Sequence, residues 1–468
     1  MPQNKKDAVL LIGRGPLFAA YIQGLINGFS EKYEVLVVDA NSPAYSGKHI
    51  RLESDYYDLV DSVDGSEVLK VEDELNLNSI YSYSNYLYYG RLAQEANLRY
   101  DIYWISRDEI NRRFYSSYLY FKKIFEKYNI VFAFHDTIDH IYSFVLEAFS
   151  KKMGFGFYHT FTIPGIFNNR LLNGTTQRLT NPHFLYELTH RSQPNEEEKE
   201  FIDELLNSFA KEKPTMDYMK VRPTSYFNRY EVVSFIKNLK YLPYAYQRIK
   251  NRAYLIKKTK NFDLSAQGKY ILFFFSHQPE SVTTSAAQEY VDQWKIVEEL
   301  AVHAPSDMNI VIKDHPFGFG WRGKDYYERL LRLPNVHMSP INYPGKDLIK
   351  NAMAVLTING SVGLEAMMYG VKSFSLGHAW YSHPDFIPNI DSPAEVYSRL
   401  EEPDLSIDQI RQIILAALRC SVDFKVEYTP AVTRDKIESG ERLAKHMMKH
   451  ERFYFHRYED IKDSVLGS

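Results

Sequence analysis

Two stretches of this chain alternate short apolar runs with longer amphipathic segments, and this alternation restricts its fold more than any other feature. The apolar runs are, in chain order, AVLLIG, EVLVVDA and IVFAFHD in the first stretch, and KYILFFF, NIVIK and AVLTI in the second. Strands that alternate with helices in this way form a parallel sheet with helices on both faces. Each stretch is therefore predicted to be a Rossmann-like α/β domain.

The length of 468 residues exceeds what one hydrophobic core usually supports. We predict an N-terminal Rossmann-like domain over 1–189, a helical linker over 190–265, a second Rossmann-like domain over 266–400, and C-terminal helices over 401–468 that pack back on the N-terminal domain. Two Rossmann-like domains facing each other across a cleft form the GT-B architecture of many nucleotide-sugar glycosyltransferases. Sugar-nucleotide epimerases and periplasmic-type binding proteins share such a pair, so the fold alone leaves the function open.

Composition excludes several classes of protein. A net charge of −3 gives no overall attraction to nucleic acid, and a single cysteine, Cys420, excludes a disulfide framework and a cysteine-based zinc site. The sequence contains no apolar run of the ~18 residues that a membrane-spanning helix needs. The first apolar run, AVLLIG, is too short for a signal peptide and is interpreted as a strand. We expect a cytoplasmic protein.

The linker contains a basic, tyrosine-rich stretch at 228–260, with nine Lys or Arg and one Glu. One interpretation is a solvated helix that bridges the two domains. The other is a patch that rests on anionic lipid or polysaccharide, where each basic residue near the surface adds about 1 kcal/mol. The second interpretation predicts peripheral contact with the inner membrane.

Polar motifs follow three predicted strands of the second stretch: SHQPESVTTS at 276–285, KDHPFGFGWR at 313–322 and NGSVGLEA at 359–366. The carboxyl ends of parallel strands meet at one edge of the sheet, which is where open α/β sheets bind their ligands. We therefore expect the three motifs to converge on one ligand.

The third motif is typical of a phosphate-binding turn. Asn359, Gly360, Ser361 and Gly363 lead from a strand into a helix, where glycines let a phosphate approach the backbone closely. An ordinary helix cap made by Ser361 is the alternative interpretation.

The second motif contains a histidine held at the end of a strand. Pro316 restricts the backbone of His315 to an extended shape, so the imidazole is kept at the mouth of the sheet. His315 could donate to a phosphate oxygen, protonate a leaving phosphate or bond to a loop. Lys313 supplies a positive charge suited to a phosphate, although the alternation of side chains along the strand can place it on the other face.

These motifs, in this order and spacing, resemble the capsule polysaccharide biosynthesis family, which includes bacterial β-Kdo transferases that use CMP-Kdo. The likeness covers residues 270–385, and its most specific marks are the dipeptides Gln278-Pro279 and His315-Pro316. The resemblance implies a GT-B fold whose C-terminal domain binds the CMP-sugar, with no metal and no other cofactor. The absence of an Asp-x-Asp motif near a strand end agrees with a metal-free site.

The resemblance also implies roles for single residues. His315, Ser361 and the turn 359–363 would hold the phosphate and ribose of CMP, and Gln278 and Glu280 would lie near the cytidine or the sugar. The acceptor, a glycan or a lipid-linked saccharide, would bind to the N-terminal domain.

The N-terminal stretch VFAFHDTIDHIYSF resembles the strand–Asp–helix segment of the same family. Asp136 is our first candidate for the catalytic carboxylate and Asp139 our second, because a hydroxyl acceptor needs a base or a retaining route needs a covalent partner. The alternative role for Asp136 is a helix cap. The acidic-Gly motif of many members, just downstream, is replaced here by TFTIPGIFNNR, which contains no carboxylate.

The sequence therefore predicts a glycosyltransferase that moves an ulosonic acid, either Kdo or a nonulosonic acid, from a CMP-sugar to a capsule or lipopolysaccharide acceptor. One alternative is a UDP- or GDP-sugar transferase, or a sugar-nucleotide epimerase. A nucleotide with two phosphates would need a second cationic contact, such as Arg322 or Lys324. Another alternative is a non-catalytic partner in capsule assembly.

Overall fold

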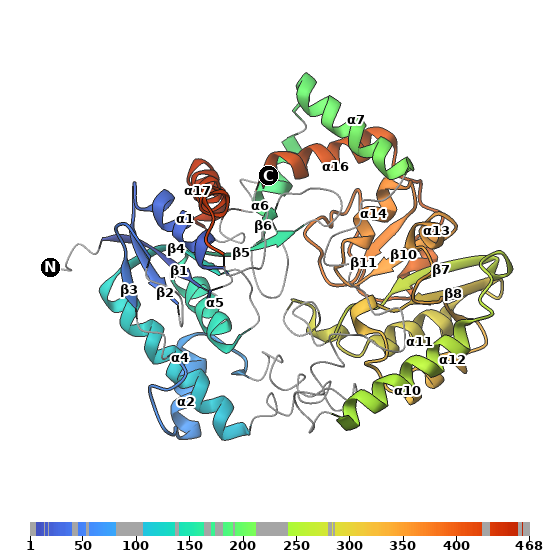
Figure 1. The fold of residues 1–468 in the computed structure, drawn as a ribbon, viewed down its shortest axis with the longest axis horizontal. Helices are drawn as coiled ribbons and strands as arrows, with labels where there is room; N and C mark the ends of the chain where they lie inside the picture. The colour runs from blue at the N-terminus through green and yellow to red at the C-terminus, as the bar shows by residue number, and fades with distance from the viewer. Residues whose placement is uncertain are drawn as a thin grey trace. The chain divides into compact units, whose positions relative to one another are not determined.

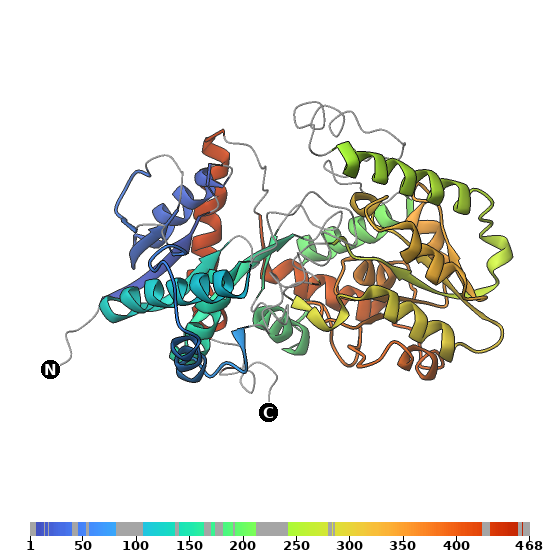
Figure 2. The ribbon, with the colours of Figure 1, turned by 90° about the horizontal axis from the view of Figure 1, so that it is seen from below.

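The computed structural model describes two compact units. The first is formed by the described residues of Met1–Tyr83, Ser106–Glu200 and Gln412–Ser468, and the second by those of Phe201–Arg411. The described residues are 6–13, 15–16, 18–39, 45–52, 56–80, 106–135, 140–162, 170–173, 181–190, 192–211, 242–278, 283, 286–423, 431–456 and 461. Figures 1 and 2 show both units as sheets flanked by helices.

The first unit contains a seven-stranded sheet in the order β12-β6-β5-β4-β1-β2-β3. Its strands are β1 (Asp7–Ile12), β2 (Glu34–Val38), β3 (Ile50–Leu52), β4 (Asn129–His135), β5 (Gly156–Thr162), β6 (Arg170–Asn173) and β12 (Ser421–Val422). The neighbouring strands β3, β2, β1, β4 and β5 pair in parallel. Strand β6 pairs antiparallel with both β5 and β12. The parallel part has the strand order of a Rossmann fold.

Helices cover the first sheet on both faces, which is why every residue from Ala8 to Ile12 in β1 is buried. The helices of this unit include α1 (Ala19–Phe29), α2 (Gly65–Glu74), α4 (Arg107–Lys127), α5 (Ile141–Met153), α6 (Pro182–His190), α17 (Arg434–Lys449) and α18 (Glu451–Tyr454).

The C-terminal helix α17 packs against α1, near the other end of the sequence (Figure 1). The two backbones approach closely because glycines face each other: a Cβ on Gly440 would lie 2.3 Å from the carbonyl oxygen of Tyr21 and 2.9 Å from Cα of Gly24. Residues 412–468 thus belong to the first unit, whereas the start of the predicted C-terminal region, 401–411, stays with the second.

The second unit contains a five-stranded parallel sheet in the order β11-β10-β7-β8-β9. Its strands are β7 (Lys269–Phe274), β8 (Met308–Lys313), β9 (Val336–Met338), β10 (Ala354–Thr357) and β11 (Ser373–Ser375). In chain order this is again the Rossmann arrangement, with β7 and β10 at the point where the order reverses.

Alternate residues of β7 pack into two separate cores, one on each face of this sheet. Ile271 and Phe273 face the core that contains side chains of α10 (Leu242–Thr259), α11 (Gln293–His303), α12 (Lys324–Leu331) and α15 (Glu395–Ser398). Tyr270 and Leu272 face the core formed with α13 (Gly345–Lys350) and α14 (Val362–Met368). The predicted α/β class with two Rossmann-like units is confirmed.

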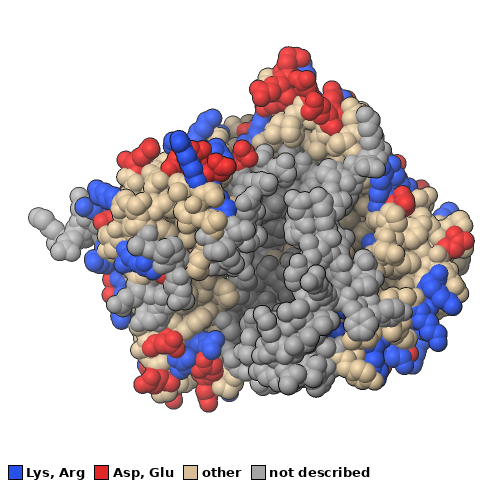
Figure 3. Space-filling view, in the orientation of Figure 1, with Lys and Arg blue, Asp and Glu red and all other residues tan. Residues whose placement is uncertain are grey.

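Two further helices, α7 (Glu196–Lys211) and α16 (Ile407–Cys420), each contain residues of both units. Three glutamates, Glu196, Glu197 and Glu198, lie in the first turn of α7, and Figure 3 shows acidic side chains gathered there. Among the described residues, no helix is both long and apolar enough to cross a membrane.

Candidate functional site

The three polar motifs of the second unit follow β10, β7 and β8, which are neighbours in the sheet. The chain continues from β7 to α11 on one face and from β10 to α14 on the other. Loops that leave toward opposite faces open a crevice at the carboxyl ends of the strands, where ligands of doubly wound sheets bind. Asn359, Ser276 and His315 lie just past these ends.

Asn359, just past the end of β10, has a buried side chain without partners among the described residues. It is 1% exposed, and neither its amide nitrogen nor its amide oxygen makes a hydrogen bond to any of those residues. An unpaired buried polar group costs about 1–3 kcal/mol, so such groups are rare in folded proteins. A ligand with both a donor and an acceptor would satisfy this amide.

The turn after Asn359 is held by a hydrogen bond from Tyr381. The Tyr381 hydroxyl donates to the carbonyl oxygen of Gly360, and burial raises the pKa of this hydroxyl, so it keeps its proton. A Cβ on Gly363 would lie 2.5 Å from the same hydroxyl oxygen. Ser361 precedes α14 but makes no capping hydrogen bond, and its hydroxyl lies 3.5 Å from Glu365. Its hydroxyl is therefore not used as the ordinary helix cap.

His315 stacks on His277, with ring centroids 5.4 Å apart, and the edge of Trp321 packs on His277 at 4.8 Å. Burial, together with the positive charges of His315, Arg322 and Arg248, lowers the pKa of His277 to about 3. His277 is therefore neutral at physiological pH. His277 lies three residues past the end of β7, as His315 lies two residues past the end of β8, and the motif SHQPESVTTS alone assigned it no role.

Asp314 and Arg322 form a buried network behind the histidines. Arg322 donates to the Asp314 carboxylate at 2.7 Å, to the Ser276 carbonyl at 2.9 Å and to the Gln278 amide oxygen at 3.3 Å. The Tyr327 hydroxyl also donates to Asp314. The charge of Arg322 is thus used to join the ends of β7 and β8.

Lys313 has a structural role in this edge of the sheet. Its side chain is buried, and its ammonium donates to the carbonyl oxygens of Pro340, Ile341 and Tyr343 at 2.8 to 3.2 Å. These contacts hold the loop that follows β9. The side chain of Lys313 thus points toward this loop, as the alternation of side chains along the strand allowed.

Gln278 and Pro316 shape their turns. The Gln278 amide donates to the Thr283 hydroxyl at 3.0 Å and to the Val291 carbonyl at 2.7 Å. Pro316 begins a short 3₁₀ turn, Pro316–Gly318, closed by a 2.8 Å bond from the Gly318 amide to the His315 carbonyl. The remaining candidates, Glu280, Asp136 and Asp139, lie outside the described residues.

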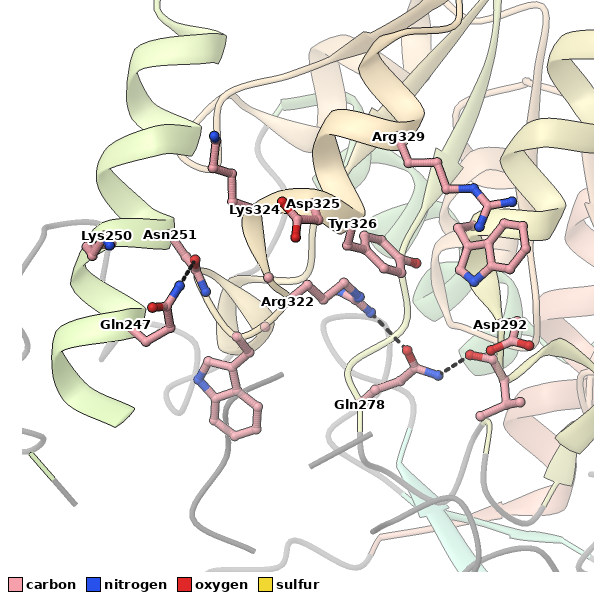
Figure 4. Close-up of a pocket in the computed structure, with 15 residues that line it drawn as sticks. Gln247, Lys250, Asn251, Gln278, Asp292, Arg322, Lys324, Asp325, Tyr326 and Arg329 are labelled. Carbon is pink, nitrogen blue, oxygen red and sulfur yellow. Dashed lines mark hydrogen bonds between the residues drawn. The ribbon is translucent and has the colours of Figure 1, made fainter. Parts of the chain in front are cut away.

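A pocket of about 640 Å³ opens beside this network in the second unit, and Figure 4 shows Arg322 and Gln278 at its wall. Its lining combines cationic, amide and aromatic side chains, which suit a polar ring compound. It is lined by Gln247, Lys250, Asn251, Gln278, Val291, Asp292, Trp294, Gly318, Trp321, Arg322, Gly323, Lys324, Asp325, Tyr326 and Arg329. Sequence reasoning missed the contribution of α10, because only the tertiary fold brings that helix to the strand ends.

The basic residues of α10 divide into two groups. Arg252 donates to the Phe319 carbonyl at 3.1 Å and Arg248 lies over the Trp321 ring, and both are buried. They support the loop after β8. Lys250, Lys257 and Lys258 are exposed. Residues 228–241 of the predicted basic patch lie outside the described residues.

In the first unit, an aspartate packs against the glycines that follow β1. The Asp39 carboxylate accepts a 3.1 Å bond from the Gly15 amide, and a Cβ on Gly13 would lie 2.0 Å from its other oxygen. His135, the last residue of β4, is buried and contacts the Tyr142 hydroxyl at 3.2 Å. Asp136 follows it directly in the sequence.

Known proteins match the second unit most clearly. Residues 216–387 match the family model described as capsule polysaccharide biosynthesis protein. The capsule polysaccharide modification protein LipB of Neisseria meningitidis, in serogroup A and serogroup B strains, is 30% identical over 118 residues. That match covers 23% of this chain and only 27% of each LipB protein.

Solved structures resemble the chain at low identity. The β-Kdo 2,7 transferase KpsC of Thermosulfurimonas dismutans is 14% identical, with a TM-score of 0.29, covering 67% of this chain and 81% of that one. UDP-GlcNAc 2-epimerase of Neisseria meningitidis is 13% identical, with a TM-score of 0.26, covering 95% and 100%. Similarity at this level identifies no substrate. Residues 216–387 are therefore similar to capsule polysaccharide biosynthesis proteins, the family that the sequence motifs resemble.

Proposed function

We propose that this protein is a glycosyltransferase that moves an ulosonic acid from a CMP-sugar to a capsule or lipopolysaccharide acceptor. The observation that carries the proposal is the buried, unpartnered amide of Asn359, placed beside the strand that leads to His277. A nucleotide monophosphate bound across the ends of β10, β7 and β8 would satisfy this amide and contact His315.

The cations of the site favour one phosphate over two. Among the described residues of the three motifs, Lys313 and Arg322 both donate to protein oxygens. Lys324, the other cation considered for a second phosphate, is half exposed and pairs with Glu328 at 3.0 Å. A diphosphate would need cations to be withdrawn from these contacts, whereas a phosphodiester needs only His315 and neutral donors such as Ser361.

In the proposed reaction, the bond between the sugar and the CMP phosphate breaks and the phosphate gains negative charge. His315 would donate a proton or a hydrogen bond to that phosphate, and Asn359 and Ser361 would hold it in place. The acceptor hydroxyl would be activated by a carboxylate of the N-terminal domain. Asp136 remains the first candidate and Asp139 the second. No metal takes part in this scheme.

Donor binding is tested by thermal unfolding with CMP, CDP, UDP and GDP. A ligand at 100 times its dissociation constant stabilises the folded state by about 2.7 kcal/mol. We expect stabilisation by CMP, lost in Asn359→Ala and His315→Ala. The matched controls are Asn351→Ala and His303→Ala, which change exposed residues that precede β10 and β8, at the amino ends of these strands. Stabilisation by UDP or GDP instead would overturn the choice of donor.

The non-catalytic alternative makes a separate prediction. The replacement of the downstream acidic motif by TFTIPGIFNNR is the observation in its favour. An enzyme would release CMP from CMP-Kdo or a CMP-nonulosonate slowly in water and faster with an acceptor. If the protein binds CMP but releases none from either donor, the assembly role replaces the catalytic one.

A further inference from the structure

We propose that His183, His446 and His450 form a transition-metal site in the first unit, with Glu187 as a fourth ligand. The site would take Zn²⁺ or a similar borderline metal ion. It lies on α6 and on the end of α17 (both labelled in Figure 1), in the first unit, whereas the described residues proposed to bind the donor belong to the second. It is independent of the proposed function, and the metal-free reaction scheme is unaffected.

The ligands come as two pairs spaced four residues apart. His183 and Glu187 lie on α6, and His446 and His450 lie on the last turn of α17 and its C-cap. Residues at this spacing share one face of a helix. Two histidines four residues apart are a common zinc-binding pair in helices, for the same geometric reason.

The side chains of the two pairs meet. One ring nitrogen from each of the three histidines lies within 4.8 Å of the others. The ring centroid of His450 is 4.3 Å from that of His183 and 4.8 Å from that of His446. In a tetrahedral zinc site the ligand nitrogens are about 3.3 Å apart, since each lies about 2.0 Å from the metal. Small rotations of the rings would close that gap.

Neighbouring groups orient the His183 ring and the Glu187 carboxylate for a metal. The Tyr454 hydroxyl lies 3.1 Å from Nδ1 of His183, while Nε2 of the same ring lies 3.6 Å from the Glu187 carboxylate. A partner on one ring nitrogen fixes the other as the metal ligand. Arg419 lies 3.4 Å from the far oxygen of Glu187 and holds that carboxylate in turn.

The surroundings also favour a metal over a simple packing role. His183 is 1% exposed and stacks on Phe453, whereas His446 and His450 are partly exposed. Three imidazoles and one carboxylate are ligands for Zn²⁺, Ni²⁺ or Cu²⁺, not for Mg²⁺ or Ca²⁺. A bound ion would tie α6 to the C-terminal helices and stabilise the first unit.

The test uses the full chain, stripped with a chelator and titrated with ZnCl₂ by calorimetry and thermal unfolding. We expect one Zn²⁺ per chain and a higher unfolding temperature. His450→Gln and Glu187→Gln should each weaken binding by about tenfold or more. Co²⁺ in place of Zn²⁺ should give the visible absorption of a tetrahedral site, with an altered spectrum in Glu187→Gln.

The control is His303→Gln, which changes an exposed histidine of the second unit. It should bind Zn²⁺ as the wild type does. The proposal is overturned if the wild type binds no Zn²⁺, or if His450→Gln binds it with unchanged affinity. Circular dichroism of each variant without metal distinguishes loss of binding from loss of folding. A variant that is folded but does not bind Zn²⁺ supports the site.

Discussion

Arg322 and Asp314 form an ion pair with both side chains buried, Nη1 of the guanidinium lying 2.7 Å from a carboxylate oxygen. Burial opposes the charge of Arg322, but the Asp314 carboxylate and the neighbouring tyrosines raise the pKa of the guanidinium above its usual value, so the arginine stays charged. Both residues follow β8, and Arg322 also donates to the carbonyl oxygen of Ser276, just past β7, at 2.9 Å. The pair therefore helps to position the turns that contain His277 and His315.

Arg322→Met should destabilise the second unit, because it leaves Asp314 charged and buried without its partner. Breaking one side of a buried ion pair costs roughly 3–5 kcal/mol. The urea transition of the second unit measures this loss. The double variant Asp314→Leu/Arg322→Met buries no charge and should recover part of it. A double variant less stable than Arg322→Met would contradict the explanation.

Asn359→Leu should make the unliganded protein more stable while it removes nucleotide binding. The substitution eliminates a buried amide without partners, so the free energy of unfolding should rise by about 1–3 kcal/mol. The matched control is Asn251→Leu, because the buried amide of Asn251 donates to the Gly320 carbonyl at 3.1 Å. That control should be destabilised. If Asn359→Leu loses stability as well, the Asn359 amide is satisfied by protein.

Local patterns predicted the sheet edge well. The turn signals in SHQP, KDHP and NGSVG mark the ends of β7, β8 and β10, because glycine, proline and clustered polar residues stop strands wherever the strands lie. The Rossmann order then brings the three ends together. The motifs and their common edge could therefore be predicted from the sequence.

The direction of Lys313, the burial of two arginines and the histidine cluster could not be predicted from the sequence, because they depend on tertiary contacts. The direction of Lys313 depends on the loop at 340–343, and the burial of Arg248 and Arg252 depends on the loop after β8. Both contacts join residues distant in the sequence. The same is true of the histidine cluster, whose members come from α6 and α17. No local pattern reports such contacts.

His277 should make stability depend on pH between its two pKa values. In the unfolded chain it takes up a proton as pH falls through its ordinary value of 6.5, but in the folded protein it does so only near pH 3. Its contribution is fully present above pH 6.5 and is lost as pH falls toward 3. From pH 7 to 5, wild type should lose roughly 1–2 kcal/mol more than His277→Gln. Parallel urea curves at the two pH values measure this, and equal losses would contradict it.

Gly440→Ala should destabilise the first unit, because the new methyl group would meet the backbone of α1 at 2.3 Å. Forcing a methyl group into such a contact separates the two helices and costs typically 1–3 kcal/mol. Gly65→Ala is the control, since a Cβ there meets nothing within 4 Å. Thermal unfolding should show a lower midpoint for Gly440→Ala than for the wild type. The control should show no decrease in its midpoint.

Replacing Lys250, Lys257 and Lys258 of α10 by glutamine should weaken binding to anionic vesicles, if this part of the basic stretch rests on a membrane. The three side chains are exposed, and each would contribute about 1 kcal/mol at an anionic surface. Co-sedimentation with vesicles that contain phosphatidylglycerol measures the change.

The control variant for this experiment removes the same charge from the first unit, at Lys70, Lys123 and Lys127, which are also exposed. Loss of binding in the α10 variant alone supports a membrane surface at this helix. Equal loss in both variants indicates attraction by charge in general. Unchanged binding, or none in the wild type, would leave α10 as a solvated helix whose buried arginines Arg248 and Arg252 support the loop after β8.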